Sequence, residues 1–561
     1  METDMELKDR NVAHALNGGP YTNVERNGTN SHNSDVEKLD RMGKKQILKT
    51  VLALFASGLY KFVVRSLPLF SDWFQTSGGP TGLLYGFIIA WLCTLSVYTV
   101  ISELASIAPI AGGQYFWVSM LAPKGQKQFY SYITGAIYVC AIIRGMVILN
   151  HPEYSPKAWH ATLLSWGVIA VCIFLNTVIS KWLPKVEGFI LIFHILGFFA
   201  ILITVVYMAP HGSARSVFLT SLNGGGWSSQ GPSFCVGFIG NVATFVGESH
   251  IQYNTLIFLT VLLKVPMLRY MSSVHMAEEI ENAAVNVPRA IFTTMVLNGA
   301  MGFAMMLAIL FCIGDAEEVL ATETGFPFIQ IFYNVTGSKS GTTVMACLVT
   351  ALSWAGTIGF TATASRMLWS FARDRGVPFH RTVMKVERRT QIPMVAVGVV
   401  TTLPALLALI YIGSRAVFND VVSLSVSGFY ASYLLPSALL LWRRTTGQVA
   451  EAVTLVTEGN ATVGRGGEKV LHMPLVWGPW RVPGILGIAN NAFACVYMVY
   501  VIFWSFWPSA TPVTPESMNY SVLVTGSVII FSVAYYILMG KNQYVGPLVD
   551  SEVIIEDIER T

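Results

Sequence analysis

The sequence contains little charge for its length, and this scarcity excludes several classes of protein. Only 12% of its 561 residues are charged, whereas a soluble domain has about 25%. The net charge of +4 is small and no basic run is interleaved with aromatic residues, so nucleic acid is not an expected partner. The seven cysteines lack metal-ligand spacing, which argues against a zinc site or a disulfide framework. A Walker phosphate-binding loop is also missing, and we expect no cofactor.

Long apolar segments are what the sequence has in abundance. Hydrophobic residues make up 53% of the chain, and many segments of roughly 20 residues match a hydrocarbon core of about 30 Å. Because backbone polar groups must be paired within lipid, these segments are predicted to be helices. Clear spans are predicted at residues 82–106, 162–180, 186–208, 290–313, 342–364, 393–412, 421–441, 482–507 and 521–539. Weaker candidates are 46–70, 129–150 and 233–270.

The basic residues sort into alternate connections, which predicts an orientation in the membrane. The richest connection follows span 342–364 and contains several arginines and Lys385. Placing the basic connections in the cytosol gives about twelve crossings with both ends inside. Residues 1–42 are then a disordered cytosolic tail, 43–540 the transmembrane domain and 541–561 a second cytosolic tail.

This topology indicates a secondary transporter rather than an enzyme, a channel or a receptor. A membrane-embedded enzyme is the main alternative, and it requires His, Asp or Glu side chains clustered at membrane depth. His194 lies within a span, but it stands alone there. We therefore interpret His194 as a packed residue and expect no enzymatic activity.

Three motifs carry a more specific resemblance. They are Ser365-Arg-Met-Leu-Trp-Ser-Phe-Ala-Arg-Asp-Arg-Gly-Val-Pro378, Ser102-Glu-Leu-Ala-Ser-Ile-Ala-Pro-Ile-Ala-Gly-Gly-Gln-Tyr-Phe-Trp117 and Ser273-Val-His-Met-Ala-Glu-Glu-Ile-Glu-Asn-Ala-Ala-Val-Asn-Val-Pro-Arg289. The set resembles the amino acid–polyamine–organocation permeases. The third motif is similar to their fungal branch, which includes γ-aminobutyrate, amino acid and choline permeases. The resemblance covers most of residues 78–540.

The resemblance implies an all-α membrane protein with about 12 transmembrane helices. They form two inverted five-helix repeats plus two C-terminal helices. It also implies secondary active transport by alternating access, driven by protons, of γ-aminobutyrate or another amino acid. A choline permease is the first alternative, and a transport-inactive membrane sensor is an alternative of another class. The plasma membrane is the expected location, and the vacuolar membrane is the alternative.

The resemblance further implies a substrate site where the first and sixth helices are broken near mid-membrane. Ends of broken helices offer unpaired N–H groups to a carboxylate and free carbonyls to a cation. In the sixth helix, glycines permit non-helical backbone. A row of small, polar and aromatic side chains in span 342–364 is expected to face the substrate from the other side. The predicted substrate-binding residues are Gly237, Phe238, Gly240, Asn241, Thr244, Phe245, Gly247, Ser353, Trp354 and Thr357. Alternatively, the glycines serve close packing between helices, and the residues of span 342–364 make contacts within the helix bundle.

A carboxylate at the inner end of a span suggests a gate. Glu103 needs a cationic partner at that depth, and Arg366, Arg373 and Arg375 in the basic loop are the expected partners. Glu279 is a second acidic candidate for the same cluster. Solvated boundary charges are the alternative for both carboxylates.

Three segments depart from the family pattern. The first span carries Lys61 and Arg65, segment 129–150 is short and leaves Arg144 stranded, and residues 248–272 form an insert. Charges within a span cost several kcal/mol unless they are paired or reach the interface. We interpret these departures as errors in exon boundaries, with a diverged site or a defective gene product as the alternatives.

Overall fold

The computed structural model describes residues 78–109, 113–123, 183–245, 283–320, 327–387, 392–410, 416–450, 475–508, 510–514 and 518–544, with scattered positions between 166 and 177. The described part is mostly helical, as the apolar segments predicted. Its longer helices are α5 (Gly79–Ile107), α9 (Leu183–Met208), α11 (Gln230–Phe245), α13 (Ala283–Cys312), α16 (Lys339–Arg373), α18 (Met394–Ile410), α19 (Ala416–Thr445), α21 (Gly484–Trp504) and α22 (Ser521–Tyr535).

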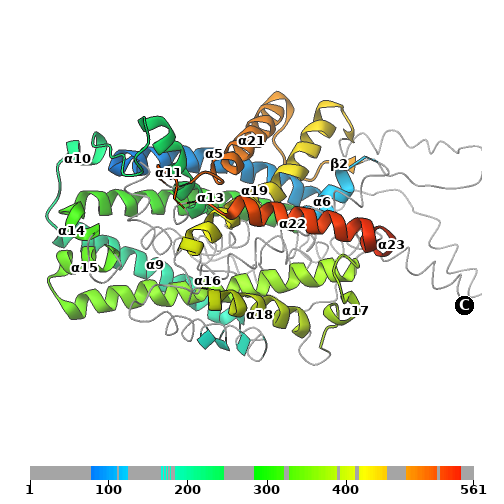
Figure 1. Ribbon diagram of the computed structural model, residues 1–561, viewed down its shortest axis with the longest axis horizontal. Helices are drawn as coiled ribbons and strands as arrows, with labels where there is room; N and C mark the ends of the chain where they lie inside the picture. Colours follow the sequence, from blue (N-terminus) through cyan, green and yellow to red (C-terminus); the bar gives the residue numbers. More distant parts are fainter. Residues whose placement is uncertain are drawn as a thin grey trace, which may run out of the picture.

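Short elements lie at the two ends of the long helices (Figure 1). One end has α6 (Gln114–Leu121), α17 (His380–Val383), α23 (Lys541–Gln543) and the strands β1 (Val449–Ala450) and β2 (Leu475–Val476). The π-helical turn η5 (Tyr536–Gly540) joins α22 to α23. The other end has α10 (Ala214–Phe218), α14 (Ala316–Leu320) and α15 (Pro327–Thr336). The two strands form one parallel pair, which the sequence did not predict.

The long helices form two packed groups. In the first group, α5 contacts α13, α11 and α21, and α19 packs against α21 and α6. In the second group, α16 contacts α15, α18, α17 and α9. The buried hydrophobic core runs through both groups. Helix α5 therefore provides the central element of the first group.

Four described helices are long and apolar enough to cross a membrane. They cover Gly79–Ile107, Ala283–Cys312, Gly484–Trp504 and Ser521–Gly540. In the last of these helices, only 11% of the most apolar 18-residue stretch is buried inside the protein. Side chains such as Leu523, Ile530 and Leu538 are largely exposed on it, as expected for a surface that lipid covers.

The predicted spans agree with the observed helices where the two can be compared. Span 82–106 corresponds to α5, 186–208 to α9, 290–313 to α13 and 421–441 to α19. Spans 46–70 and 129–150, and the insert 248–272, lie outside the described residues. The positions agree because a membrane helix is defined by its apolar run, which is a local property of the sequence. Helix α13 begins earlier than its predicted span, and α19 extends beyond its span at both ends.

Helix α16 is longer than its predicted span. It continues to Arg373, so Arg366 and Arg373 lie on the helix and not in a loop. A helix of 35 residues has a length of about 52 Å, which exceeds the hydrocarbon thickness. The prediction was wrong because it ended the helix at the first charged residue, whereas a helix that leaves the membrane can carry charge.

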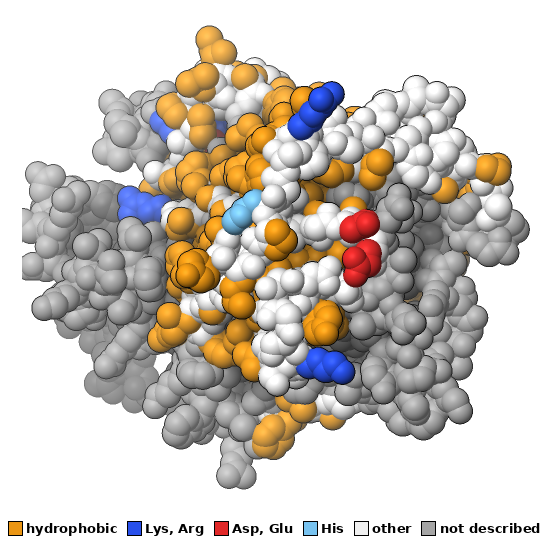
Figure 2. All heavy atoms as spheres, turned by 90° about the vertical axis from the view of Figure 1, so that its left-hand side faces the viewer, with side chains coloured by type: hydrophobic (Ala, Val, Ile, Leu, Met, Phe, Trp, Pro, Cys, Tyr) orange, Lys and Arg blue, Asp and Glu red, His pale blue; other side chains and the backbone are white. Residues whose placement is uncertain are grey.

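Most of the described basic residues lie at the end that contains α6 and α17. They include Arg289, Arg373, Arg375, Arg381, Lys385, Arg443, Arg444, Arg481 and Lys541. Among the described residues of the opposite end, which faces the viewer in Figure 2, a few charged side chains lie among hydrophobic and uncharged ones. Described charges there are Arg215, Asp315, Glu318 and Lys339.

Candidate functional site

A buried junction of aromatic rings and hydroxyl groups lies where α5, α11, α19 and α21 meet. Thr94 of α5 lies 3.3 Å from the Tyr430 hydroxyl of α19 and 3.1 Å from the Tyr497 hydroxyl of α21, measured from its Oγ1. The Phe238 ring of α11 lies 6.5 Å from the Tyr497 ring. Buried hydroxyl groups need partners, and here three helices supply them to one another.

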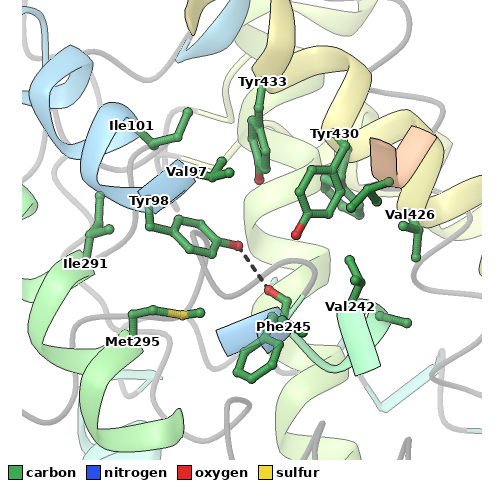
Figure 3. Close-up of a cluster of buried hydrophobic side chains, with 14 of the residues drawn as sticks. Val97, Tyr98, Ile101, Val242, Phe245, Ile291, Met295, Val426, Tyr430 and Tyr433 are labelled. Carbon is green, nitrogen blue, oxygen red and sulfur yellow. Dashed lines mark hydrogen bonds between the residues drawn. The ribbon is translucent and has the colours of Figure 1, made fainter. Parts of the chain in front are cut away.

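Tyr98 extends this junction to the end of the described part of α11. Its hydroxyl donates a hydrogen bond of 3.0 Å to the Phe245 carbonyl, as Figure 3 shows. The Tyr98 ring lies 6.4 Å from that of Tyr433 on α19. The phenol of α5 is thus held between a side chain of α19 and the backbone of α11.

Asn241 lies one turn earlier on α11 and is also buried, with 3% of its surface exposed. Its Nδ2 has no hydrogen-bond partner among the described residues. A Cβ atom added to Gly86 of α5 would collide with this nitrogen. The glycine therefore allows the amide to approach the α5 backbone closely, and a buried donor remains beside the junction.

The structure brings part of the predicted substrate set together. Gly237, Phe238, Gly240, Asn241, Thr244 and Phe245 are all buried on α11. The helix is continuous through Gly237 and Gly240, so these glycines do not break it. This expectation was wrong because a glycine only permits non-helical backbone, and α11 retains its helical conformation there while it packs against α5.

Other predicted residues cannot be compared in the same way. Gly247 lies outside the described residues. Ser353, Trp354 and Thr357 are on α16, in a stretch where the structure describes the helix without its side chains. Sequence reasoning missed Tyr98, Tyr430, Tyr433 and Tyr497, although a tyrosine within an apolar span is itself a signal, because its buried hydroxyl needs a partner.

Glu103 forms a buried ion pair at the basic end of α5. Its Oε1 lies 2.6 Å from Nη2 of Arg444, and the exposed fractions of the arginine and glutamate side chains are 6% and 1%. The same oxygen accepts a hydrogen bond of 2.8 Å from the Val482 N–H. The carboxylate thus binds both the end of α19 and the segment that leads into α21.

Arg444 makes two further contacts that fix its side chain. Its Nη1 donates a hydrogen bond of 2.6 Å to the Gly487 carbonyl. Its guanidinium lies 4.6 Å from the ring centre of Trp477, which is a favourable cation–π distance. Arg444 therefore joins α19, the segment after β2 and the first turn of α21 to Glu103.

The described ion pair differs from the predicted gate. Glu103 is paired with Arg444, which the sequence analysis did not consider, and not with Arg366, Arg373 or Arg375. Glu279 lies outside the described residues. The pairing was missed because helix α19 reaches the end of α5 only through the tertiary fold, and the positions lie 341 residues apart.

The predicted basic partners occupy other surroundings. Arg373 lies 4.8 Å from the ring centre of Trp369, and Arg366 is buried on α16. Arg375 follows the helix with a φ of 61° and is exposed. These three residues are thus distributed along the end of α16.

A second buried contact joins α6 to the end of α16. The Tyr115 hydroxyl donates a hydrogen bond of 2.7 Å to Oδ2 of Asp374 and lies 2.8 Å from Oγ of Ser370. A carboxylate at a helix C-terminus faces the negative end of the helix dipole. The phenol stabilises it there.

Several described helices that are long and apolar enough to cross a membrane are typical of a multi-pass integral membrane protein. A family model described as amino acid permease matches residues 50–528. The chain therefore belongs to the amino acid permease family, which is a family of transporters.

Curated relatives agree with this assignment. A putative amino acid/polyamine transporter of Macrophomina phaseolina is 28% identical over 79% of this chain and 91% of its own length. A choline transporter of Saccharomyces cerevisiae is 28% identical over 84% of this chain and 77% of its own length. Amino-acid permease 2 of Neurospora crassa is 23% identical over 93% of this chain and 91% of its own length. The relatives thus carry the names of different substrates.

Proposed function

We propose that this chain is a secondary active transporter of a small organic amine or amino acid. The observation that carries the proposal is the buried aromatic and hydroxyl junction at the end of α11, where Tyr98 binds the Phe245 carbonyl. Sites for small molecules combine apolar walls with a few convergent polar groups. The family model supports the same class of function.

A cationic nitrogen is the shared feature of the candidate substrates. Aromatic faces attract such a group by cation–π interaction, and rings of Tyr98, Tyr433, Phe238 and Phe245 line the junction. An amino acid such as γ-aminobutyrate also carries a carboxylate, and the amide donor of Asn241 is one group suited to it. A choline-like substrate would use the rings and leave this donor without a charged partner.

Alternating access requires the site to open to one side at a time. We propose that the Glu103–Arg444 pair is part of the inner closure, because it fixes the basic ends of α5, α19 and α21 together. The twelve-helix arrangement with two inverted repeats remains the working topology. Coupling to protons and a location in the plasma membrane complete the proposal, and the vacuolar membrane is the alternative location.

We expect Tyr98→Phe to reduce saturable uptake of the radiolabelled substrate. The change removes one hydrogen bond, and about 1 kcal/mol of lost stabilisation corresponds to a roughly threefold to tenfold effect. Uptake is measured in cells that express the chain, with γ-aminobutyrate, other amino acids and choline as probes. Tyr207→Phe is the control, since Tyr207 is 88% exposed.

The uptake assay also separates the function classes. A transport-inactive sensor would bind a probe without accumulating it, and this result would contradict the proposal. If choline alone is accumulated, the amino acid assignment is wrong and the amine transporter remains. Equal uptake by the Tyr98→Phe variant and the wild-type chain would remove the junction from the substrate path.

We expect both chain termini to face the cytosol. The physical reason is the concentration of described basic residues at the end where α17 and α23 lie, since basic residues near membrane helices stay inside. Tags placed at each terminus of the full chain are tested with impermeant antibody before and after the cells are permeabilised. A C-terminal tag stained on intact cells would contradict the orientation.

A further inference from the structure

A buried tyrosine follows the last helix that the structure describes. Only Ser521 and Ser532 are buried on α22, whereas Tyr544, after α23, is 1% exposed. The Tyr544 ring lies 5.8 Å from the Phe371 ring on α16, and Phe371 lies 5.2 Å from Tyr115 on α6. The chain therefore leaves the described structure next to the last turn of α16.

A basic surface with exposed hydrophobic groups begins four residues beyond Phe371. We define the α17 surface as Arg375, Phe379, Arg381, Met384 and Lys385, all of which are exposed. The exposed fractions of Phe379 and Met384 are 84% and 42%. Burial lowers the pKa of the neighbouring His380, and Arg375 and Arg381 lower it further. Glu387 is the exposed acid nearby.

The chain after Tyr544 has the complementary composition. Its acidic residues are Asp550, Glu552, Glu556, Asp557 and Glu559, against Arg560 as the only basic one between positions 545 and 561. Apolar residues Val553, Ile554, Ile555 and Ile558 alternate with them. The segment thus offers both negative charge and apolar side chains to a surface that exposes positive charge, an aromatic ring and a thioether.

The chain after Tyr544 is long enough to reach the α17 surface. Asp550 lies six positions after Tyr544, and six steps of extended chain span about 20 Å. The tether holds the segment close to α17, which raises its effective concentration there without any new contact. We propose that residues 545–561 dock on the α17 surface of the same chain and hold the ends of α16 and α22 together.

The test is cross-linking within the full chain, purified in detergent and in nanodiscs. Met384→Cys is combined with Ile554→Cys, treated with a short bismaleimide, and the joined peptides are quantified by mass spectrometry. Ile554→Cys with Met518→Cys is the control pair, since Met518 is 38% exposed and lies near the end that contains α10. We expect efficient joining of Met384→Cys with Ile554→Cys only.

Charge reversal tests the chemistry of the contact. Arg381→Glu with Lys385→Glu should lower the yield about tenfold at low salt, because complementary charges set such pairing and salt screens them. Glu556→Lys with Asp557→Lys, added to these changes, should restore part of it. Arg215→Glu, at an exposed position of α10, should leave the yield unchanged.

Two results would overturn the proposal. One is a yield that is insensitive to salt and to both reversals, which would mean chance collision of a tethered cysteine. The other is loss of the cross-link in nanodiscs with anionic lipid but not in zwitterionic ones, which would assign the α17 surface to lipid headgroups.

Discussion

Replacing Arg444 with glutamine is expected to remove most of the properly folded protein from the membrane. The change leaves Glu103 buried with its charge unpaired, and its Oε2 already has no hydrogen-bond partner among the described residues. Removing one member of a buried ion pair costs about 3–5 kcal/mol. This is a large part of the stability of a typical domain, about 5–15 kcal/mol.

The measurement is the yield of monodisperse protein after detergent extraction, together with its thermal unfolding midpoint. Arg215→Gln serves as the matched control, because this arginine is exposed on α10. The paired change Glu103→Gln with Arg444→Gln removes both charges and should recover part of the loss. If Arg444→Gln unfolds at the same temperature as wild type, the pair contributes nothing and the proposed inner closure is wrong.

Substituting alanine for Gly299 is expected to destabilise the contact between α5 and α13. A Cβ atom at this position would collide with the indole of Trp91. The same indole donates a hydrogen bond of 3.0 Å from Nε1 to the Met295 carbonyl on α13, which fixes the ring against this helix. Overpacking of this kind costs about 1–3 kcal/mol.

The matched control is Gly526→Ala on α22. Nothing lies within 4 Å of a Cβ at Gly526. In the interior of a helix, alanine is more favourable than glycine by about 1 kcal/mol of folding free energy. Gly526→Ala should therefore unfold at the wild-type temperature or above it, whereas Gly299→Ala should unfold below it. Adding Trp91→Phe should relieve the clash. Equal midpoints for the two glycine variants would contradict the close packing of α5 and α13.

The helices were predictable because each one coincides with a local run of apolar residues in the sequence. Spans 290–313 and 421–441 anticipate α13 and α19, since the membrane requires roughly 20 apolar residues wherever a helix crosses it. The end of α16 was not predictable in this way. Beyond Ala364 the helix carries charged residues and continues to Arg373, and α16 contacts α17 and α18, which are separate in the sequence.

Of the residues at the buried junction, the sequence singled out only those on α11, and their role in substrate binding stays a prediction. Phe238, Asn241 and Phe245 stand in one short segment that the family resemblance singles out. Tyr98 of α5 contacts Phe245 and Tyr497 of α21 contacts Phe238, and no local pattern relates those positions to one another. The same holds for Arg444, which pairs with Glu103 across 341 positions. A single sequence indicates that Glu103 needs a cation, and the tertiary fold decides which one.

The contact between Glu103 and Arg444 also has a meaning for how such chains diverge. Either residue can be lost safely only when the other is lost or replaced with it, because a solitary buried charge is the costly state. The two positions are therefore expected to change together in evolution. Recombination between the gene segments that encode them would break up the pair. In hybrids of two permeases, a junction between α5 and α19 therefore joins compatible halves only when both parents carry the same pair.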